Sequence, residues 1–161
     1  RPNAYDQNPI IKGLTQEEAM DTLQRAADAG LVHSVSNSQE GGWYICNCCT
    51  CSCGILRGMA EMGMANVVAR SSYINVVEPD LCNGCETCVD FCQFDALELG
   101  DDFVMTVSDL RCVGCGVCVP VCDTEALSLV LRDQPEVPPV TEDDWLEARA
   151  EARGQDLEEL R

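Results

Sequence analysis

The sequence has very little of the side chains that catalysis and nucleic-acid binding commonly use. Among 161 residues, His33 is the one histidine and Lys12 is the one lysine. General acid–base chemistry would have to rest on carboxylates, and no nucleophile–base arrangement or glycine-rich nucleotide fingerprint stands out. The formal net charge of −18 argues against binding to nucleic acid, because such binding needs clustered lysine and arginine side chains.

Long apolar runs are also missing. No stretch approaches the roughly 20 apolar residues that a membrane-spanning helix needs, and no secretory or transit segment is visible. Because the first residue is Arg1 rather than methionine, we expect a chain that was processed or cut from a longer one. The acidic composition favours a redox partner with a basic docking surface, although acidity also keeps a small protein soluble.

Cysteine, in contrast, accounts for 13 residues. Eight of them form two copies of the pattern Cys-x-x-Cys-x-x-Cys-x-x-x-Cys, which lie 30 residues apart. A spacing that recurs in register is an internal repeat rather than an accident of composition. The first copy contains Cys82, Cys85, Cys88 and Cys92, and the second contains Cys112, Cys115, Cys118 and Cys122.

The spacing of this repeat suits iron–sulfur chemistry. A cubane 4Fe–4S cluster needs four thiolates, one for each iron. Cysteines three residues apart can turn inward around a single object, and Gly84 and Gly114 let the backbone come close to sulfur. Disulfides or zinc are the alternatives, but zinc sites more often use two Cys-x-x-Cys pairs.

The repeat resembles the motif of bacterial-type two-cluster ferredoxins over about residues 73–131. In that family the fourth cysteine of each run binds the other cluster. The resemblance therefore implies one 4Fe–4S cluster on Cys82, Cys85, Cys88 and Cys122, and a second on Cys112, Cys115, Cys118 and Cys92.

The chain departs from this family after each fourth cysteine. The family usually has proline there, and this chain has Gln93 and Asp123. Because proline is not a ligand, the difference concerns the local backbone and the redox potential rather than ligation.

The resemblance implies an α+β fold with a ferredoxin-like, duplicated β-α-β core. We expect a two-cluster ferredoxin domain at residues 71–132. Before it, residues 1–70 should form an N-terminal helix, a hairpin and a Cys-rich metal-binding subdomain. After it, residues 133–161 should form a proline-containing linker and an acidic C-terminal helical tail.

Local patterns predict the elements of these parts. Thr15 and Glu18 form a capping box that begins a helix over residues 16–29. A hairpin is expected from strands at 31–36 and 43–45, and a second helix, broken by Gly58 and Gly63, at 55–64. Further strands are expected at 73–77, 97–99, 103–107 and 127–131, and an acidic first turn predicts a last helix starting near Thr141.

The segment Cys46–Cys53 carries five cysteines in eight residues: Cys46, Cys48, Cys49, Cys51 and Cys53. We refer to it as the Cys-rich segment. Alternate residues of an extended chain share a face at a spacing of roughly 6.6 Å, which suits neighbouring corners of a cubane. A straight strand cannot present four thiols tetrahedrally, so the chain must turn.

Three interpretations of the Cys-rich segment compete. We favour a third iron–sulfur cluster with four of these cysteines as ligands, and His33 is an alternative ligand. The others are a zinc or other structural metal site, and uncoordinated redox thiols or a disulfide. The layout is similar to Cys-rich segments in multi-cluster iron–sulfur subunits of anaerobic bacteria, a resemblance that assigns no ligands.

These features predict an electron-transfer protein rather than an enzyme that turns over a substrate by itself. Iron–sulfur clusters change oxidation state one electron at a time, and acidic surroundings favour low potentials. We expect either a ferredoxin-like carrier or the relay domain of a larger anaerobic oxidoreductase, in a reducing cytoplasm. A catalytic, incompletely ligated cluster or a structural zinc site at the Cys-rich segment is the alternative.

Overall fold

The computed structural model describes residue 10 and residues 13–42, 44–63 and 71–157. The chain divides into two compact units, Arg1–Asn47 with Pro139–Arg161, and Cys48–Pro138. The predicted three-part division at residues 70 and 132 stays a prediction. None of the helices in the described residues has both the length and the apolar character that crossing a lipid bilayer requires.

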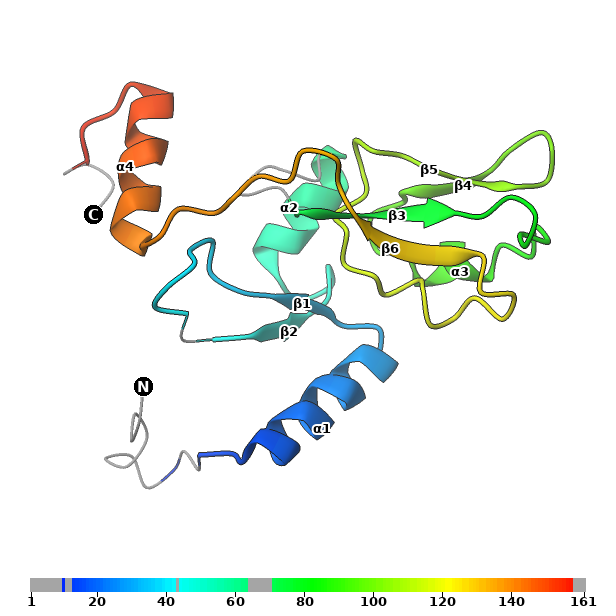
Figure 1. Ribbon diagram of the computed structural model, residues 1–161, viewed down its shortest axis with the longest axis horizontal. Helices are drawn as coiled ribbons and strands as arrows, with labels where there is room; N and C mark the ends of the chain where they lie inside the picture. The colour runs from blue at the N-terminus through cyan, green and yellow to red at the C-terminus, as the bar shows by residue number, and fades with distance from the viewer. Residues whose placement is uncertain (1–9, 11–12, 43, 64–70, 158–161) are drawn as a thin grey trace. The chain divides into compact units, whose positions relative to one another are not determined.

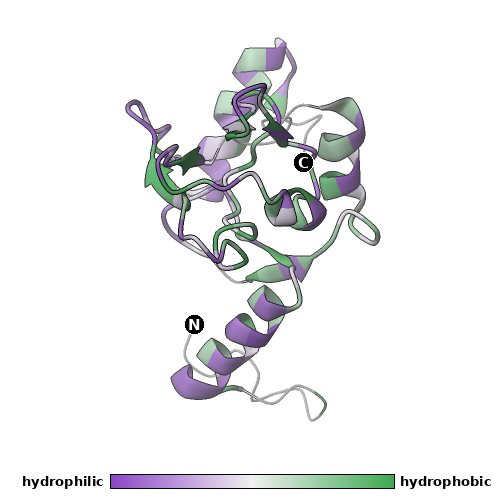
Figure 2. Cartoon of the chain, turned by 90° about the vertical axis from the view of Figure 1, so that its right-hand side faces the viewer, coloured by the Kyte–Doolittle hydropathy of each residue, from purple (hydrophilic) through white to green (hydrophobic). Residues whose placement is uncertain are grey.

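The first unit begins with helix α1 (Gln16–Asp28). The Thr15 hydroxyl accepts a hydrogen bond from the Glu18 amide at 3.2 Å, and the Glu18 carboxylate accepts one from the Thr15 amide at 2.8 Å. This confirms the predicted capping box. Ala29 is the C-cap, and Gly30 follows it in the left-handed conformation with φ 71°. Figure 2 shows polar and apolar residues on different sides of this helix, which lies beside the N label.

Strands β1 (Val32–Ser34) and β2 (Cys46–Cys48) form a two-stranded sheet. The return strand predicted at residues 43–45 was therefore placed too early, and Trp43 lies outside the described residues. The connection between the strands is held elsewhere, because the amides of Gln39 and Glu40 donate to the carbonyls of Pro139 and Val140. The backbone of Gln39 and Glu40 therefore bonds to the segment before α4 and not across a tight turn between the two strands.

The C-terminal helix α4 (Glu142–Arg153) begins as predicted at Thr141, whose hydroxyl accepts from the Asp144 amide at 3.2 Å. Hydrogen bonds from Thr141 lower the pKa of the Asp144 carboxyl. The Arg149 guanidinium lies over the Trp145 ring, 5.1 Å from its centroid. The first-turn acids complement the helix dipole.

The second unit contains two antiparallel strand pairs, as Figure 1 shows. Strand β3 (Tyr73–Val77) pairs with β6 (Leu127–Leu131), and β4 (Leu97–Leu99) pairs with β5 (Met105–Val107). The predicted strands at 73–77, 97–99 and 127–131 are confirmed, and the one at 103–107 is shorter than predicted because Phe103 adopts a positive φ of 61°. A duplicated ferredoxin-like core stays a proposal.

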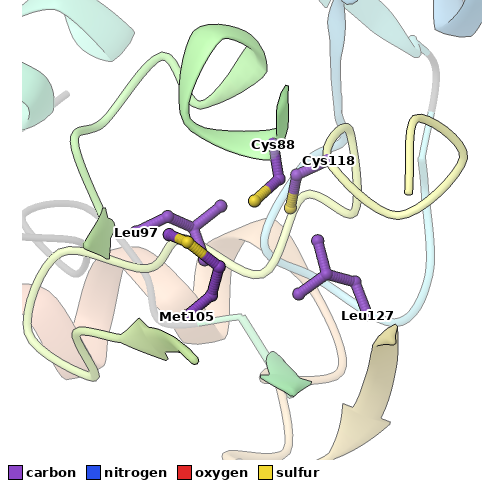
Figure 3. Close-up of a cluster of buried hydrophobic side chains, with 5 residues drawn as sticks. All are labelled: Cys88, Leu97, Met105, Cys118 and Leu127. Atoms are coloured by element: carbon purple, nitrogen blue, oxygen red, sulfur yellow. The ribbon is translucent and has the colours of Figure 1, made fainter. Parts of the chain in front are cut away.

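The connections between these strands carry the cysteine runs. Helix α3 (Thr87–Phe91) follows the first loop, whereas turns occupy the equivalent part of the second run. The core between the runs is small, and two of its five buried residues are cysteines. Figure 3 shows the side chains of Cys88 and Cys118 side by side, with Leu97, Met105 and Leu127 packed around them.

Helix α2 (Gly54–Met62) follows the Cys-rich segment. The predicted break at Gly58 was wrong, because this glycine lies inside the helix. The helix ends at Gly63, which takes the left-handed conformation with φ 64°. The predicted end at Met64 lies outside the described residues.

Candidate metal centres

Two pockets in the second unit collect the eight cysteines of the repeat. Site A is the pocket whose lining includes Cys82, Cys85, Cys88 and Cys122. Site B is the pocket whose lining includes Cys112, Cys115, Cys118 and Cys92. In each pocket three thiols come from one run and the fourth from the other run, which is the grouping that the ferredoxin resemblance implied. The assignment of each of these cysteines as an iron ligand stays a prediction.

Two glycines let the cysteine loops come close to neighbouring backbone. Gly84 has φ 67°, and a Cβ there would lie 2.6 Å from the Phe103 carbonyl oxygen. Gly114 has φ 64°, and a Cβ there would lie 2.1 Å from the Tyr73 carbonyl oxygen. Residues with a side chain rarely adopt such a φ, and a backbone carbonyl cannot move far enough to relieve so short a contact. Glycine is therefore required for the close approach of each loop.

Hydrogen bonds reach the sulfur atoms of site A. The Met105 amide donates to Cys82 Sγ at 3.4 Å, and the Thr87 hydroxyl donates to Cys85 Sγ at 3.5 Å. Hydrogen bonds from the Thr87 side chain and backbone lower the pKa of the Cys85 thiol. For Cys122, burial acts to raise the pKa, but hydrogen bonds from Thr124 and from backbone amides outweigh it and lower the pKa overall. Such donors favour thiolates.

Site B is more deeply buried. Burial, with the neighbouring cysteine charges adding to it, raises the pKa of the Cys118 thiol to about 12. Burial also raises the pKa of Cys115. Two N–H groups nevertheless point at sulfur, from the Ala96 amide to Cys92 at 3.3 Å and from Asn75 Nδ2 to Cys118 at 3.0 Å. Four soft sulfur donors with N–H partners in an apolar surrounding fit an iron–sulfur cluster, whose irons would supply the positive charge that buried thiolates need.

Sequence reasoning missed Asn75. It lies in the middle of the apolar strand β3, is only 3% exposed, and lines site B. Its Oδ1 has no hydrogen-bond partner within the described part of the chain. The available signal was a single side-chain amide inside the run Tyr-Ile-Asn-Val-Val, because a polar group buried in a strand costs free energy unless it has a hydrogen-bond partner. The reason here is the donation of its N–H to Cys118.

We expect Asn75→Met to lower the redox potential of site B. Methionine copies Met105, the residue 30 positions later that lines site A. An N–H···S bond stabilises the more negative, reduced state, so its loss should lower the potential by roughly 60 mV, if the differential stabilisation is about 1.4 kcal/mol. A potentiometric titration followed by electron paramagnetic resonance (EPR) measures both sites, and site A is the internal control. An unchanged potential at site B would contradict this role for Asn75.

The Cys-rich segment turns sharply, as expected, but its thiols are not all free. Cys49 and Cys51 form a disulfide, while Cys46, Cys48 and Cys53 are free thiols. The disulfide uses two of the five predicted ligands, so a site with four cysteine ligands would require its reduction. Over the ranges that the structure describes, no group of three or more His, Cys, Asp or Glu side chains is placed to hold a single metal ion. The third metal site stays a prediction.

The predicted alternative ligand His33 has a different contact. Its Nδ1 lies 2.5 Å from the Asn47 side-chain oxygen, and the side chain is exposed. Nearby in the sequence, Cys53 is the N-cap of α2, and backbone N–H groups of Leu56 and Ile55 lower the pKa of its thiol. A lowered pKa at a helix N-terminus is typical of a reactive or metal-binding thiol.

Two arginines contact this region and its surroundings. Arg57 donates from Nε to the Thr50 carbonyl at 3.1 Å and also to the Cys51 carbonyl. Arg111, which the sequence analysis did not single out, donates to the Phe94 carbonyl at 2.8 Å and to the Ala60 carbonyl at 3.4 Å. It precedes Cys112 and ties α2 to the cysteine repeat.

Residues 81–126 match the family described as the 4Fe-4S dicluster domain. The matched stretch begins just before Cys82 and ends after Cys122, so it contains both cysteine runs. The chain contains an iron–sulfur, ferredoxin-like module. The match and the eight cysteines support the binding of 4Fe–4S iron–sulfur clusters by this module and a role in electron transfer. A comparison with curated proteins found no match for the chain.

Proposed function

We propose that the chain transfers single electrons through two 4Fe–4S clusters, one at site A and one at site B. The observation that carries this proposal is the grouping of the thiols: each pocket is lined by three cysteines of one run and the fourth of the other. This grouping makes the two sites interdependent and keeps them within one small fold. A 4Fe–4S cluster supplies a one-electron couple when bound.

The residues of the chain tune this couple rather than carry out chemistry on a substrate. Amide and hydroxyl donors to sulfur stabilise added negative charge, whereas the acidic composition, with a formal net charge of −18, opposes it. We infer low potentials and no substrate turnover by this chain alone. The function is that of a ferredoxin-like carrier, or of the electron relay of a larger anaerobic oxidoreductase, in a reducing cytoplasm.

The net negative charge also indicates a class of redox partner. A net charge of −18 favours acceptors and donors with basic docking surfaces. Electron transfer from the dithionite-reduced holoprotein to a basic c-type cytochrome tests both the function and the partner class. We expect up to one electron per cluster to be delivered, and a rate that falls about tenfold between low salt and 0.5 M salt because screening removes electrostatic steering.

The control for this experiment is an acidic one-electron acceptor protein, whose reduction should become faster as salt is added. A chain that carries clusters but delivers no electrons would contradict the proposed function. A rate to the basic acceptor that does not depend on salt would contradict only the proposed partner class.

A third metal site at the Cys-rich segment, which the sequence favoured, is the alternative to the Cys49–Cys51 disulfide. A third iron–sulfur cluster, or a zinc ion, on four of Cys46, Cys48, Cys49, Cys51 and Cys53 would extend the relay or give a structural clip. Either requires the Cys49–Cys51 disulfide to open. Metal analysis of the protein decides between these possibilities.

A further inference from the structure

The Cys49–Cys51 disulfide is a redox group that two one-electron clusters do not account for. Thr50 lies between its two cysteines, and the Thr50 amide donates to Gln93 Oε1 at 2.8 Å. Gln93 directly follows Cys92, whose thiol lines site B. A single hydrogen bond therefore links the residue inside the disulfide loop to the residue beside a ligand position of site B.

Arg57 holds the same turn through its carbonyl groups. Its guanidinium donates to the carbonyls of Thr50 and Cys51. Because a guanidinium is always charged, it keeps a positive charge beside the pair when electrons arrive. A nearby positive charge favours the sulfur anions that form on reduction before protons are added. Cys51 is exposed to solvent, which can supply those protons.

The residue that makes the link is also a departure from the ferredoxin pattern. Proline is usual in that family at this position, and proline has no side-chain group that could accept a hydrogen bond. The equivalent position of the second half holds Asp123, which is exposed. The two halves thus offer a matched pair of positions, with the Cys-rich segment bonded to only the first of them in the described structure.

On the basis of the two-cluster function proposed above, we propose that Cys49 and Cys51 form a redox-active dithiol–disulfide pair that exchanges electrons with site B. On reduction the S–S bond breaks, two electrons enter, and two protons from solvent complete two thiols; oxidation is the reverse. The electrons come from a low-potential one-electron donor, and two clusters in one chain hold the two that are needed. The pair thereby converts single electrons into a two-electron store.

The test uses the complete holoprotein, purified without oxygen and equilibrated at a series of fixed potentials. EPR and visible absorption report the state of the clusters. Denaturation with N-ethylmaleimide and a chelator, followed by mass spectrometry of the peptide that contains the Cys-rich segment, reports the fraction of disulfide. We expect Cys49 and Cys51 to gain labels together, with the thiol-to-disulfide ratio changing tenfold for about every 30 mV, as a two-electron couple requires.

Two results would overturn the proposal. One is a pair that stays a disulfide at potentials where both clusters are reduced. The other is a pair that takes labels at every potential in protein holding about 12 iron, which would make these cysteines ligands of a third cluster. Absence of any cluster signal would instead contradict the two-cluster function, and EPR separates that failure from the others.

A pair of variants tests the link to site B. After rapid reduction of the clusters, Gln93→Ala should slow the appearance of the Cys49 and Cys51 thiols about tenfold, because one hydrogen bond that holds the turn is lost. Asp123→Ala, at the matched position, should leave the rate unchanged. Iron content and EPR confirm that both variants keep their clusters. Equal rates in Gln93→Ala and the unsubstituted protein would contradict the role of Gln93.

Discussion

Replacement of Cys92 by alanine should remove the cluster of site B and leave that of site A. Cys92 belongs by sequence to the first run, but its thiol lines the pocket of the second run with Cys112, Cys115 and Cys118. A cluster with three protein thiolates and one open iron in a buried pocket is expected to be lost, so the iron content should fall by about half. Iron analysis and EPR of the reduced protein measure the effect.

The mirror-image variant Cys122→Ala supplies the control. It should remove the cluster of site A, whose other thiols belong to the first run, and spare site B. Because the two sites have different donors to sulfur, their EPR signals should differ, and the two variants should each retain a different signal. If Cys92→Ala instead removed the cluster of its own run, the exchange of the fourth ligand between the runs would be wrong.

Among the glycines of the described residues, Gly114 should be the one whose replacement by alanine disturbs folding most. A Cβ at this position would lie 2.1 Å from the Tyr73 carbonyl oxygen and 2.8 Å from the Ser71 hydroxyl, at a φ of 64°. Contact with backbone at that distance and a strained φ act together, so we expect a loss of at least about 4 kcal/mol in stability, or no folded protein. Denaturant unfolding of the holoprotein and its cluster content measure the loss.

Gly58→Ala is the matched control for this substitution. Gly58 lies inside helix α2, and a Cβ there would meet nothing within 4 Å. Alanine should therefore stabilise the helix by about 0.5–1 kcal/mol, because it loses less conformational entropy on folding than glycine. A Gly114→Ala protein as stable as the Gly58→Ala protein would contradict the close approach of the second cysteine loop to strand β3.

The local elements that carry their own signals were predictable from the sequence. Thr15 and Thr141 begin helices because each is followed by a carboxylate that returns a hydrogen bond to its amide, and this pattern is visible in four residues. The strands Tyr73–Val77 and Leu127–Leu131 were also predictable from β-branched and apolar residues. These signals are local, so the elements can be predicted without knowing which other segment of the chain packs against them.

What the sequence did not predict depends on contacts between distant residues. Asn75 reads as an odd residue in a strand until Cys118, 43 positions later, is placed against its amide. The same separation lies between Thr50 and Gln93, so the bond that links the Cys-rich segment to the repeat left no local pattern. The second strand of the first unit was placed too early, and the bonds from Gln39 and Glu40 to Pro139 and Val140 are non-local as well.

The most direct test of the central claim is the content of iron, acid-labile sulfide and zinc per chain, in protein purified without oxygen. Two 4Fe–4S clusters require about 8 iron and 8 sulfide, and we expect these values with no zinc and with Cys49 and Cys51 able to form their disulfide. About 8 iron with one zinc, or about 12 iron and 12 sulfide, would keep the two clusters but make the Cys-rich segment a metal site. Substantially less than 8 iron in fresh protein would contradict the two-cluster account.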